Sequence, residues 1–166
     1  NVRIQYLNLD FIDSLVGVCQ AFEEDKIVVD YIDVKADTYY IEAVIRNYEN
    51  NIIYAINEND FSCVEGYLLP NSDLYKSQKR LISYLNSKKI KEELNNYSIE
   101  DIVENKDGFY KVYVYENIDI IYPDGRKVTK EYYWIYTVVP YKMPKKLRMS
   151  SEIDYRLSKI EKWNKK

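Results

Sequence analysis

The sequence predicts an α+β fold in which helices pack on one strongly bent antiparallel sheet of about four strands. In the first half of the chain apolar residues recur at intervals of three and four, as in helices, whereas after Lys89 they alternate with polar residues, as in strands. Helices that precede a run of strands are typical of α+β proteins rather than of parallel α/β folds. The length of 166 residues fits one domain with an additional segment.

The beginning of the chain has no evident partner in the remaining sequence. Residues 7–23 place apolar side chains at helical spacing, and residues 26–34 (KIVVDYIDV) are typical of a short strand. We expect residues 1–36 to be an N-terminal lead or the end of a preceding extracytoplasmic domain. Residues 37–166 then form the main domain.

A long helix is expected to begin at Asp37 or Thr38, either of which can cap it. The helix should end at Asn57, Asn59 and Asp60, since Asn and Asp favour turn and cap conformations. Its apolar stripe is predicted to face the core and consists of Tyr40, Val44, Tyr48, Ile52, Ala55 and Ile56.

Two shorter helical segments should follow. Residues 60–69 predict a single helical turn that Pro70 ends. Ser72 then caps a helix over Asp73–Ser87, with Asp73 at the positive end of the helix dipole. The residues predicted to lie on one side of this helix are Leu74, Gln78, Leu81, Ile82 and Leu85.

The sheet is expected to consist of one long hairpin and two flanking strands. The first strand covers Ile90–Glu104 with an interruption near Asn95 and Asn96, and the last covers Asp154–Trp163. Between them, Phe109–Tyr122 and Arg126–Val139 form the hairpin. Arms of this length must twist and curl.

The hairpin turn, Pro123-Asp124-Gly125, predicts the register of the two arms. Pro at the first position and Gly in the left-handed position fit a type I turn followed by a bulge. This register places four residues of one arm, Val112, Val114, Glu116 and Ile120, opposite Tyr136, Trp134, Tyr132 and Val128 of the other. The reverse face carries Tyr113, Tyr115 and Tyr133, which are candidates for an exposed adhesive patch.

The residues that usually carry catalysis or hold metals are scarce. The chain has no His, which excludes Ser-His-Asp and Cys-His systems as they are usually built. Cys19 and Cys63 match no zinc spacing, and the four glycines are too scattered for a phosphate-binding loop. We therefore expect no metal and no cofactor. The two Cys can form a disulfide or remain free buried thiols.

One carboxylate, Glu116, interrupts the apolar face of the hairpin. In a cavity it can act as a general base, because burial raises the pKa of a carboxyl group. Alternatively, it pairs with Lys130, its diagonal neighbour in the predicted register. Tyr132, Trp134 and Tyr136 share this face, where they can line a pocket for a sugar ring or an apolar ligand, or simply fill the core.

Charge is unevenly distributed along the chain, although the net charge is only −3. Residues 1–60 carry −8, whereas residues 141–166 carry +6. Lys145, Lys146 and Arg148 in this basic end are candidates for binding a polyanion, and the alternative is a solvated strand edge. A uniformly basic nucleic-acid binder is excluded by the overall balance of charge.

Five stretches of the chain, taken in order, carry a resemblance to a known family. They are YAINENDFSCVEGYL (54–68), LPNSDLYKSQKRLISYL (69–85), KKIKEEL (88–94), GFYKVYVYENIDIIYPDG (108–125) and KEYYWIYTV (130–138). Residues 39–139 thereby resemble the C-terminal nuclear-transport-factor-2-like domain of TcaA-type proteins, the teicoplanin-resistance-associated membrane proteins of Gram-positive bacteria. The resemblance implies a cone-shaped cystatin-like fold and an extracytoplasmic position in a membrane-anchored chain. It also implies a role in glycopeptide susceptibility and wall-polymer attachment.

Three functions remain open at this point. The first is a non-enzymatic envelope domain that binds a protein partner or a wall polymer, with its membrane anchor upstream. The second is a small-molecule pocket enzyme of isomerase or dehydratase type, with Glu116 as base. The third is a scaffold module that forms a homodimer through the sheet. No nucleic-acid partner is expected.

Overall fold

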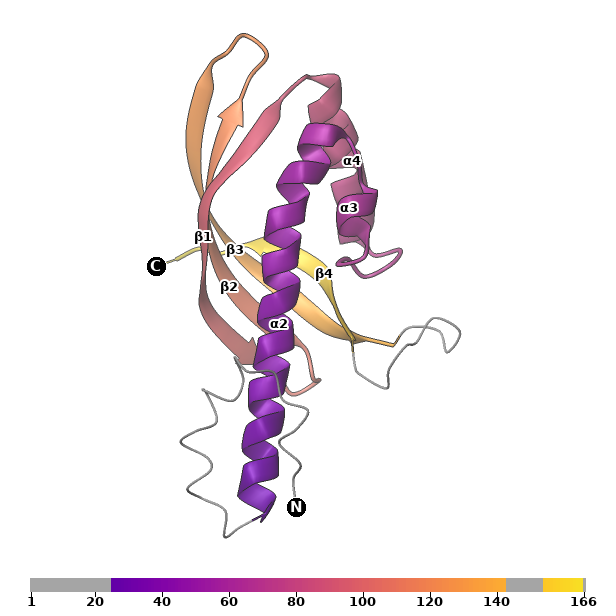
Figure 1. Cartoon of the computed structure of the whole chain (residues 1–166), viewed down its shortest axis with the longest axis vertical. Helices are drawn as coiled ribbons and strands as arrows, with labels where there is room; N and C mark the ends of the chain where they lie inside the picture. The colour runs from indigo at the N-terminus through magenta and orange to yellow at the C-terminus, as the bar shows by residue number, and fades with distance from the viewer. Residues whose placement is uncertain (1–24, 143–153, 166) are drawn as a thin grey trace, which may run out of the picture. The chain divides into compact units, whose positions relative to one another are not determined.

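The computed structural model describes residues 25–142 and 154–165, with side chains from Thr38 onward. The chain divides into two compact units, residues 1–38 and 39–166, and the second is described below. Its elements in chain order (Figure 1) are α2 (Asp25–Glu58, which begins in the first unit), α3 (Ser62–Glu65), α4 (Asp73–Ser87), β1 (Lys91–Glu104), β2 (Tyr110–Ile121), β3 (Lys127–Tyr141) and β4 (Asp154–Lys162).

The four strands form one antiparallel sheet in the order β1-β2-β3-β4. The sheet curves around the part of α2 that belongs to this unit, residues 39–58, and α3 and α4 lie beside the same part of the helix (Figure 1). The core lies between the concave face of the sheet and these helices, and its fully buried members include Ile41, Ile45, Val112 and Val138. The predicted α+β fold is confirmed.

Helix α2 is longer than predicted and corrects two expectations. Residues 26–34 are helical, so the predicted strand there is wrong. Asp37 and Thr38 lie inside the helix and do not cap it. Because residues 26–58 contain neither Gly nor Pro, nothing stops the cooperative growth of the helix, and each β-branched residue disfavours it by only about 0.5 kcal/mol. The predicted helix at 7–23 lies outside the described residues.

Five of the six residues predicted for the buried face of α2 are buried, and the face extends one residue beyond them to include Ile41, Ile45 and Glu49. Tyr40 is 39% exposed, whereas its neighbour Ile41 is fully buried. The fully or nearly fully buried positions of the helix are Ile41, Val44, Ile45, Tyr48, Glu49, Ile52, Ala55 and Ile56. A carboxylate, Glu49, is therefore part of the face that packs against the sheet.

Helix α4 has the predicted bounds and the predicted cap. The Ser72 hydroxyl accepts a hydrogen bond from the Tyr75 backbone N–H at 3.1 Å. Leu74 and Ile82 are buried, but Leu81 is 39% exposed, which contradicts its predicted place on the inner side. Helix α4 covers only the edge of the core, so fewer of its apolar side chains are buried than their spacing in the sequence predicts.

The β2–β3 hairpin has the predicted register, with Val114 opposite Trp134 and Glu116 opposite Tyr132. The turn is closed by the backbone N–H of Tyr122, which donates to the carbonyl of Arg126 at 2.9 Å, and Gly125 has a φ of 85°. The predicted interruption of the first strand is also present, because the register of β1 shifts between Leu94 and Asn96.

Both outer strands of the sheet are partly covered at their free edges. On β1, the side chain of Asn57 donates to the carbonyl of Glu92 at 2.8 Å and accepts from its N–H at 2.9 Å. On β4, Leu157 exchanges backbone hydrogen bonds with Tyr67 and Leu69 in the connection between α3 and α4. Covered edges of this kind discourage further strands from pairing with the sheet.

Candidate functional site

The hairpin face that carries Glu116 is assembled as the sequence predicts, but its contacts are internal. Trp134 Nε1 donates to Glu116 Oε2 at 2.9 Å, and the Tyr136 hydroxyl lies 2.5 Å from Glu116 Oε1. Lys130 is exposed and lies opposite Ile118, so the alternative of a Glu116–Lys130 ion pair is wrong. The Tyr132 and Trp134 rings stack at a centroid distance of 5.4 Å.

A second carboxylate, Glu49 of α2, completes a cluster that sequence reasoning missed. The hydroxyl of Tyr136 lies 2.5 Å from Glu49 Oε1, and the Tyr136 ring packs edge-on against Tyr48. Glu49 and Tyr136 are each 1% exposed and Glu116 is 6% exposed. The available signal was the position of Glu49 four residues after Ile45, within the apolar stripe of the helix.

Burial controls the protonation of this Glu–Tyr–Glu cluster (Glu49, Tyr136 and Glu116). Loss of hydration raises the pKa of Glu49 well above its ordinary value, and the nearby Glu116 carboxylate raises it further. The pKa values of Tyr136 and Tyr48 are likewise raised well above 10, first by burial and then by the charge on Glu49. Glu49, Tyr136 and Tyr48 thus favour their protonated forms.

An acidic groove of about 480 Å³ lies between α2 and β1 and reaches the cluster from outside. Burial, together with the charge on Glu116, raises the pKa of one groove residue, Glu92, to about 7. The residues that line the groove are Glu49, Asn50, Ile53, Asn57, Glu92, Glu93, Leu94 and Asn95.

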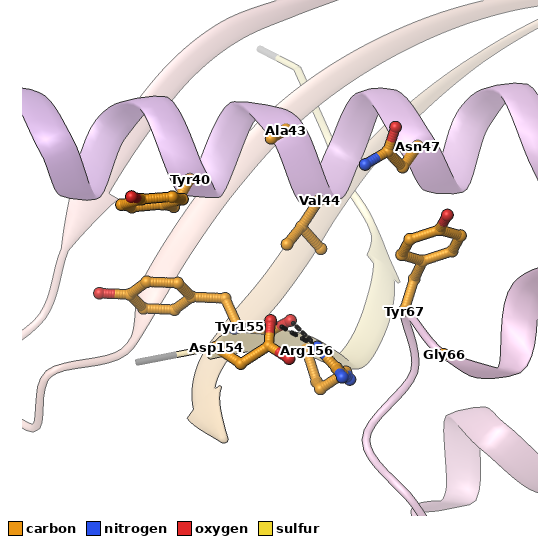
Figure 2. A pocket seen from close by; sticks show the side chains of 9 residues that line it. All are labelled: Tyr40, Ala43, Val44, Asn47, Gly66, Tyr67, Asp154, Tyr155 and Arg156. Atoms are coloured by element: carbon orange, nitrogen blue, oxygen red, sulfur yellow. Dashed lines mark hydrogen bonds and ion pairs between the residues drawn. The ribbon is translucent and has the colours of Figure 1, made fainter. Parts of the chain in front are cut away.

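A second pocket, of about 260 Å³, is formed by α2, the connection between α3 and α4, and the first residues of β4. Figure 2 shows Tyr40 and Val44 pointing from α2 toward Tyr155. The lining of this aromatic pocket consists of Tyr40, Ala43, Val44, Asn47, Gly66, Tyr67, Asp154, Tyr155 and Arg156. Sequence reasoning missed it, because three distant segments supply the lining and none carries a recognisable motif.

The polar side of the aromatic pocket is organised around Arg156, which is 8% exposed. Its Nη1 lies 2.7 Å from Asp154 Oδ1 and donates to the carbonyl of Tyr155 at 2.9 Å. The guanidinium also lies over the ring of Tyr141, 5.1 Å from its centroid. These contacts hold the planar guanidinium against the Asp154 carboxylate (Figure 2) and the Tyr141 ring.

Of the predicted ligand-binding residues, Glu116 and Tyr136 are buried in the core, Tyr132 and Trp134 are half-buried, and Lys130 is exposed. Glu116, Tyr132, Trp134 and Tyr136 line neither the acidic groove nor the aromatic pocket. On the reverse face, Tyr113 and Tyr133 pack against Trp163 with ring centroids 5.0 and 5.8 Å apart. A partly exposed aromatic patch is thus present on the outer side of the sheet.

Several remaining predictions concern residues that the structure does not describe. Lys145, Lys146 and Arg148 lie outside the described ranges, and so does Cys19. Cys63 is a free thiol. In residues 25–142 and 154–165 no three acidic or cysteine side chains are placed to hold a metal ion. No helix in the same ranges combines the length and the apolar character that a membrane span requires.

Comparison with known proteins shows a similarity in sequence to a bacterial membrane protein. The chain is 34% identical over 85 residues to the uncharacterized membrane protein YvbJ of Bacillus subtilis (strain 168). That alignment covers 51% of this chain, and it spans only 14% of the length of YvbJ.

Among solved structures, the fold resembles the intermembrane space region of the chloroplast protein ARC6, with a TM-score of 0.56 and 11% identity over 74% of this chain and 92% of that one. This likeness concerns the fold alone. Aln2 from a Streptomyces species gives a TM-score of 0.47 and 9% identity over 74% of this chain and 90% of that one.

The chain also matches a known protein family over most of its length. Residues 28–152, most of the chain, match the family described as the TcaA protein NTF2-like domain. The curved four-stranded antiparallel sheet packed on helices is the architecture expected for such a domain. This chain belongs to the family of TcaA protein NTF2-like domains.

Proposed function

We propose that this domain is a non-enzymatic binding module on the extracytoplasmic side of a membrane-anchored envelope protein, and that it binds an anionic wall polymer. The family match and the naming of YvbJ as a membrane protein support the cellular setting. The observation that carries the choice of ligand is the aromatic pocket of Figure 2.

The lining of the aromatic pocket suits a sugar unit. Tyrosine rings present apolar faces to the C–H groups of a sugar, while hydroxyl, amide and carboxylate groups hydrogen-bond its hydroxyls. Tyr40, Tyr67 and Asn47 supply such groups at the margin, and the Asp154–Arg156 pair supplies them at the inner side. A volume of about 260 Å³ accommodates a single ring rather than a larger ligand.

The sequence that follows Tyr141 is basic, which suits a polymer with anionic groups. Residues 142–148 (KMPKKLR) contain four positive charges and no negative charge. It belongs to the connection of residues 142–153, which joins Tyr141, under the Arg156 guanidinium, to Asp154, which lines the pocket. Positive charges next to a sugar site attract polyanions, and salt screens the attraction.

The electrostatic part is tested by reversing three charges. The variant K145E/K146E/R148E should bind purified wall polymer at least tenfold more weakly at low salt, and its binding should depend less on salt concentration. The matched control K88E/K89E/K106E reverses the same number of charges, at exposed lysines elsewhere, and should bind within twofold of the unmodified chain. Unchanged binding in the first variant would remove this part of the proposal.

The pocket itself is tested on two exposed residues of α2, so that folding is preserved. N47A and Y40A should each weaken polymer binding several-fold, because they remove a hydrogen-bonding group and a ring from the pocket. Y54A is the control, since Tyr54 is 56% exposed on the same helix and lines neither pocket. If all three variants bind the polymer equally well, the polymer does not bind in the aromatic pocket.

A role in glycopeptide susceptibility extends the same proposal to the whole protein. If the domain acts by holding wall polymer, the full-length protein with the three charge reversals should change teicoplanin susceptibility in the same direction as deletion of the protein. The control with Lys88, Lys89 and Lys106 reversed should behave as the unmodified protein. If deletion of the protein changes teicoplanin susceptibility but neither variant does, the effect on susceptibility does not depend on polymer binding.

A further inference from the structure

Three side chains from three different elements meet in the core around one hydroxyl group. Glu49 comes from α2, Glu116 from β2 and Tyr136 from β3. The Tyr136 oxygen lies 2.5 Å from Glu49 Oε1 and 2.5 Å from Glu116 Oε1. Tyr136 is 87 residues from Glu49 along the chain, so this contact connects the helix directly to the middle of the sheet.

The number of protons in this arrangement follows from its geometry. A phenol has a single hydrogen and can donate it to only one carboxylate. The other contact of 2.5 Å is a hydrogen bond only if the second carboxyl group keeps its own proton. Two ionised carboxylates would leave one pair of oxygens in contact without a proton, in a buried site where such repulsion is strong.

The partners indicate which carboxyl group carries the proton. Glu116 Oε2 accepts a hydrogen bond from Trp134 Nε1, a donor that stabilises the ionised form. Among the described residues the Glu49 carboxyl has hydrogen bonds with Tyr136 and with Glu116 itself, the second of which favours its protonated form, and Glu49 is the more buried of the two glutamates. Glu49 therefore donates to the Tyr136 oxygen, and Tyr136 donates to the Glu116 carboxylate.

No neighbouring charge in the described part of the chain compensates an ionised Glu49. The titratable groups coupled to the cluster from the elements packed around it are Tyr48 of α2, Glu92 and Tyr97 of β1, and Tyr132 of β3, while Glu42 and Arg46 of α2 act on Tyr97. Arg46 is the one cation among them, and it is exposed. The acidic groove, lined by both Glu49 and Glu92, offers the route by which the proton can leave.

We propose that the proton held by Glu49 fastens α2 to the sheet, so that the domain contains a pH-dependent latch which opens the acidic groove when the proton is lost. Burial and the charge on Glu116, which raise the pKa of Glu49, support this proposal. A carboxyl group whose pKa is raised by folding contributes stability that is full at acid pH, below its unfolded pKa. That contribution is lost as pH rises through the folded pKa.

The protonated state is tested first without changing the cluster. Infrared spectra of the E92Q variant at pH 8 should contain the carbonyl band of a buried protonated carboxyl group, and the band should disappear at higher pH. Using E92Q removes the contribution of Glu92. If the chain has no protonated carboxyl band at pH 8, the proposal is overturned, whatever the variants of Glu49 do.

The latch is tested by comparing E49Q with E42Q in the same E92Q background. Gln at position 49 is a neutral donor, so the equilibrium constant of folding should change less than twofold between pH 6 and pH 9. With Glu49 present it should fall at least tenfold, and backbone amides of α2 next to the cluster should exchange faster with solvent after correction for intrinsic rates. Glu42 is exposed on the same helix, and E42Q should keep the full fall. A fall in E49Q equal to that in E42Q would overturn the latch.

Discussion

The side chain of Asn57, in the last turn of α2, forms two hydrogen bonds with the backbone of Glu92 at the start of β1. The amide thereby takes the place of a neighbouring strand at the edge of the sheet. It satisfies one donor and one acceptor that would otherwise face solvent or another chain. The contact also holds the end of the helix at the acidic groove, since both residues line it.

N57A should lower the free energy of unfolding by about 1–2 kcal/mol, because both hydrogen bonds are partly buried and are replaced by bonds to water. The measurement is chemical denaturation followed by circular dichroism. N51A is the control: Asn51 is on the same helix and donates only to the carbonyl of Asn47 at an exposed position. A loss of stability no greater in N57A than in N51A would show that the edge contact contributes nothing.

W134F should lower the free energy of unfolding by about 2–4 kcal/mol, since the Glu116 carboxylate loses its indole donor inside the core and the smaller ring leaves a void. W163F makes the same substitution on the outer face of the sheet, where the ring contacts Tyr113 and Tyr133. It should lower stability by about 1 kcal/mol or less. Both variants should be followed by circular dichroism, because each removes one of the two tryptophans on which a fluorescence signal depends. Equal losses of stability would contradict the prediction.

G125A should lower stability by about 1 kcal/mol, because the hairpin turn holds this residue at a φ of 85°, where a Cβ atom is strained. G66A is the opposite case: the residue has a φ of −66° and an added Cβ meets no atom within 4 Å. It should leave stability unchanged or raise it by up to about 1 kcal/mol. The unfolding temperature should therefore fall in G125A and should not fall in G66A, and an equal fall in both variants would refute the backbone argument.

The free energy of unfolding should fall as pH rises from 4.5 to 7, and Glu92 should account for part of the fall. Its pKa is about 7 in the folded chain against an ordinary value of 4.5, so the folded state holds the proton more tightly in this range. The contribution is at most about 3 kcal/mol, and water in the groove reduces it. In E92Q the fall should be shallower by this amount.

E93Q provides the control for this pH dependence. Glu93 is exposed and pairs with Lys127 at 2.7 Å, so its loss should change stability by about 1 kcal/mol or less. Denaturation curves measured at half-unit steps of pH for both variants decide the matter. A fall as steep in E92Q as in E93Q would mean that Glu92 ionises as it does in water.

Features that depend on neighbouring residues were predictable from the sequence. The turn at Pro123-Asp124-Gly125 determines how Glu116 and Tyr132 pair, because two strands that share a turn of given length have only one register. The bounds of Asp73–Ser87 follow from the Ser72 cap and the helical period, both of which are local. The change of period after Lys89, from helix to strand, is equally local and indicated the α+β fold.

Features that depend on distant residues were decided by the tertiary structure. Only packing against the sheet determines that Ile41, rather than Tyr40, faces the core. The same packing brings Glu49 to Tyr136 from 87 residues away, which no pattern in either segment announces.

The aromatic pocket also depends on the tertiary structure, because α2, the α3–α4 connection and β4 each supply part of its lining. Hydrophobic periodicity identifies which elements form and broadly which side they bury, but it leaves the rotation of a helix against its neighbour undetermined by a residue or so. That rotation minimises the free energy of the whole core, and in this chain it places a carboxylate, Glu49, among the buried side chains.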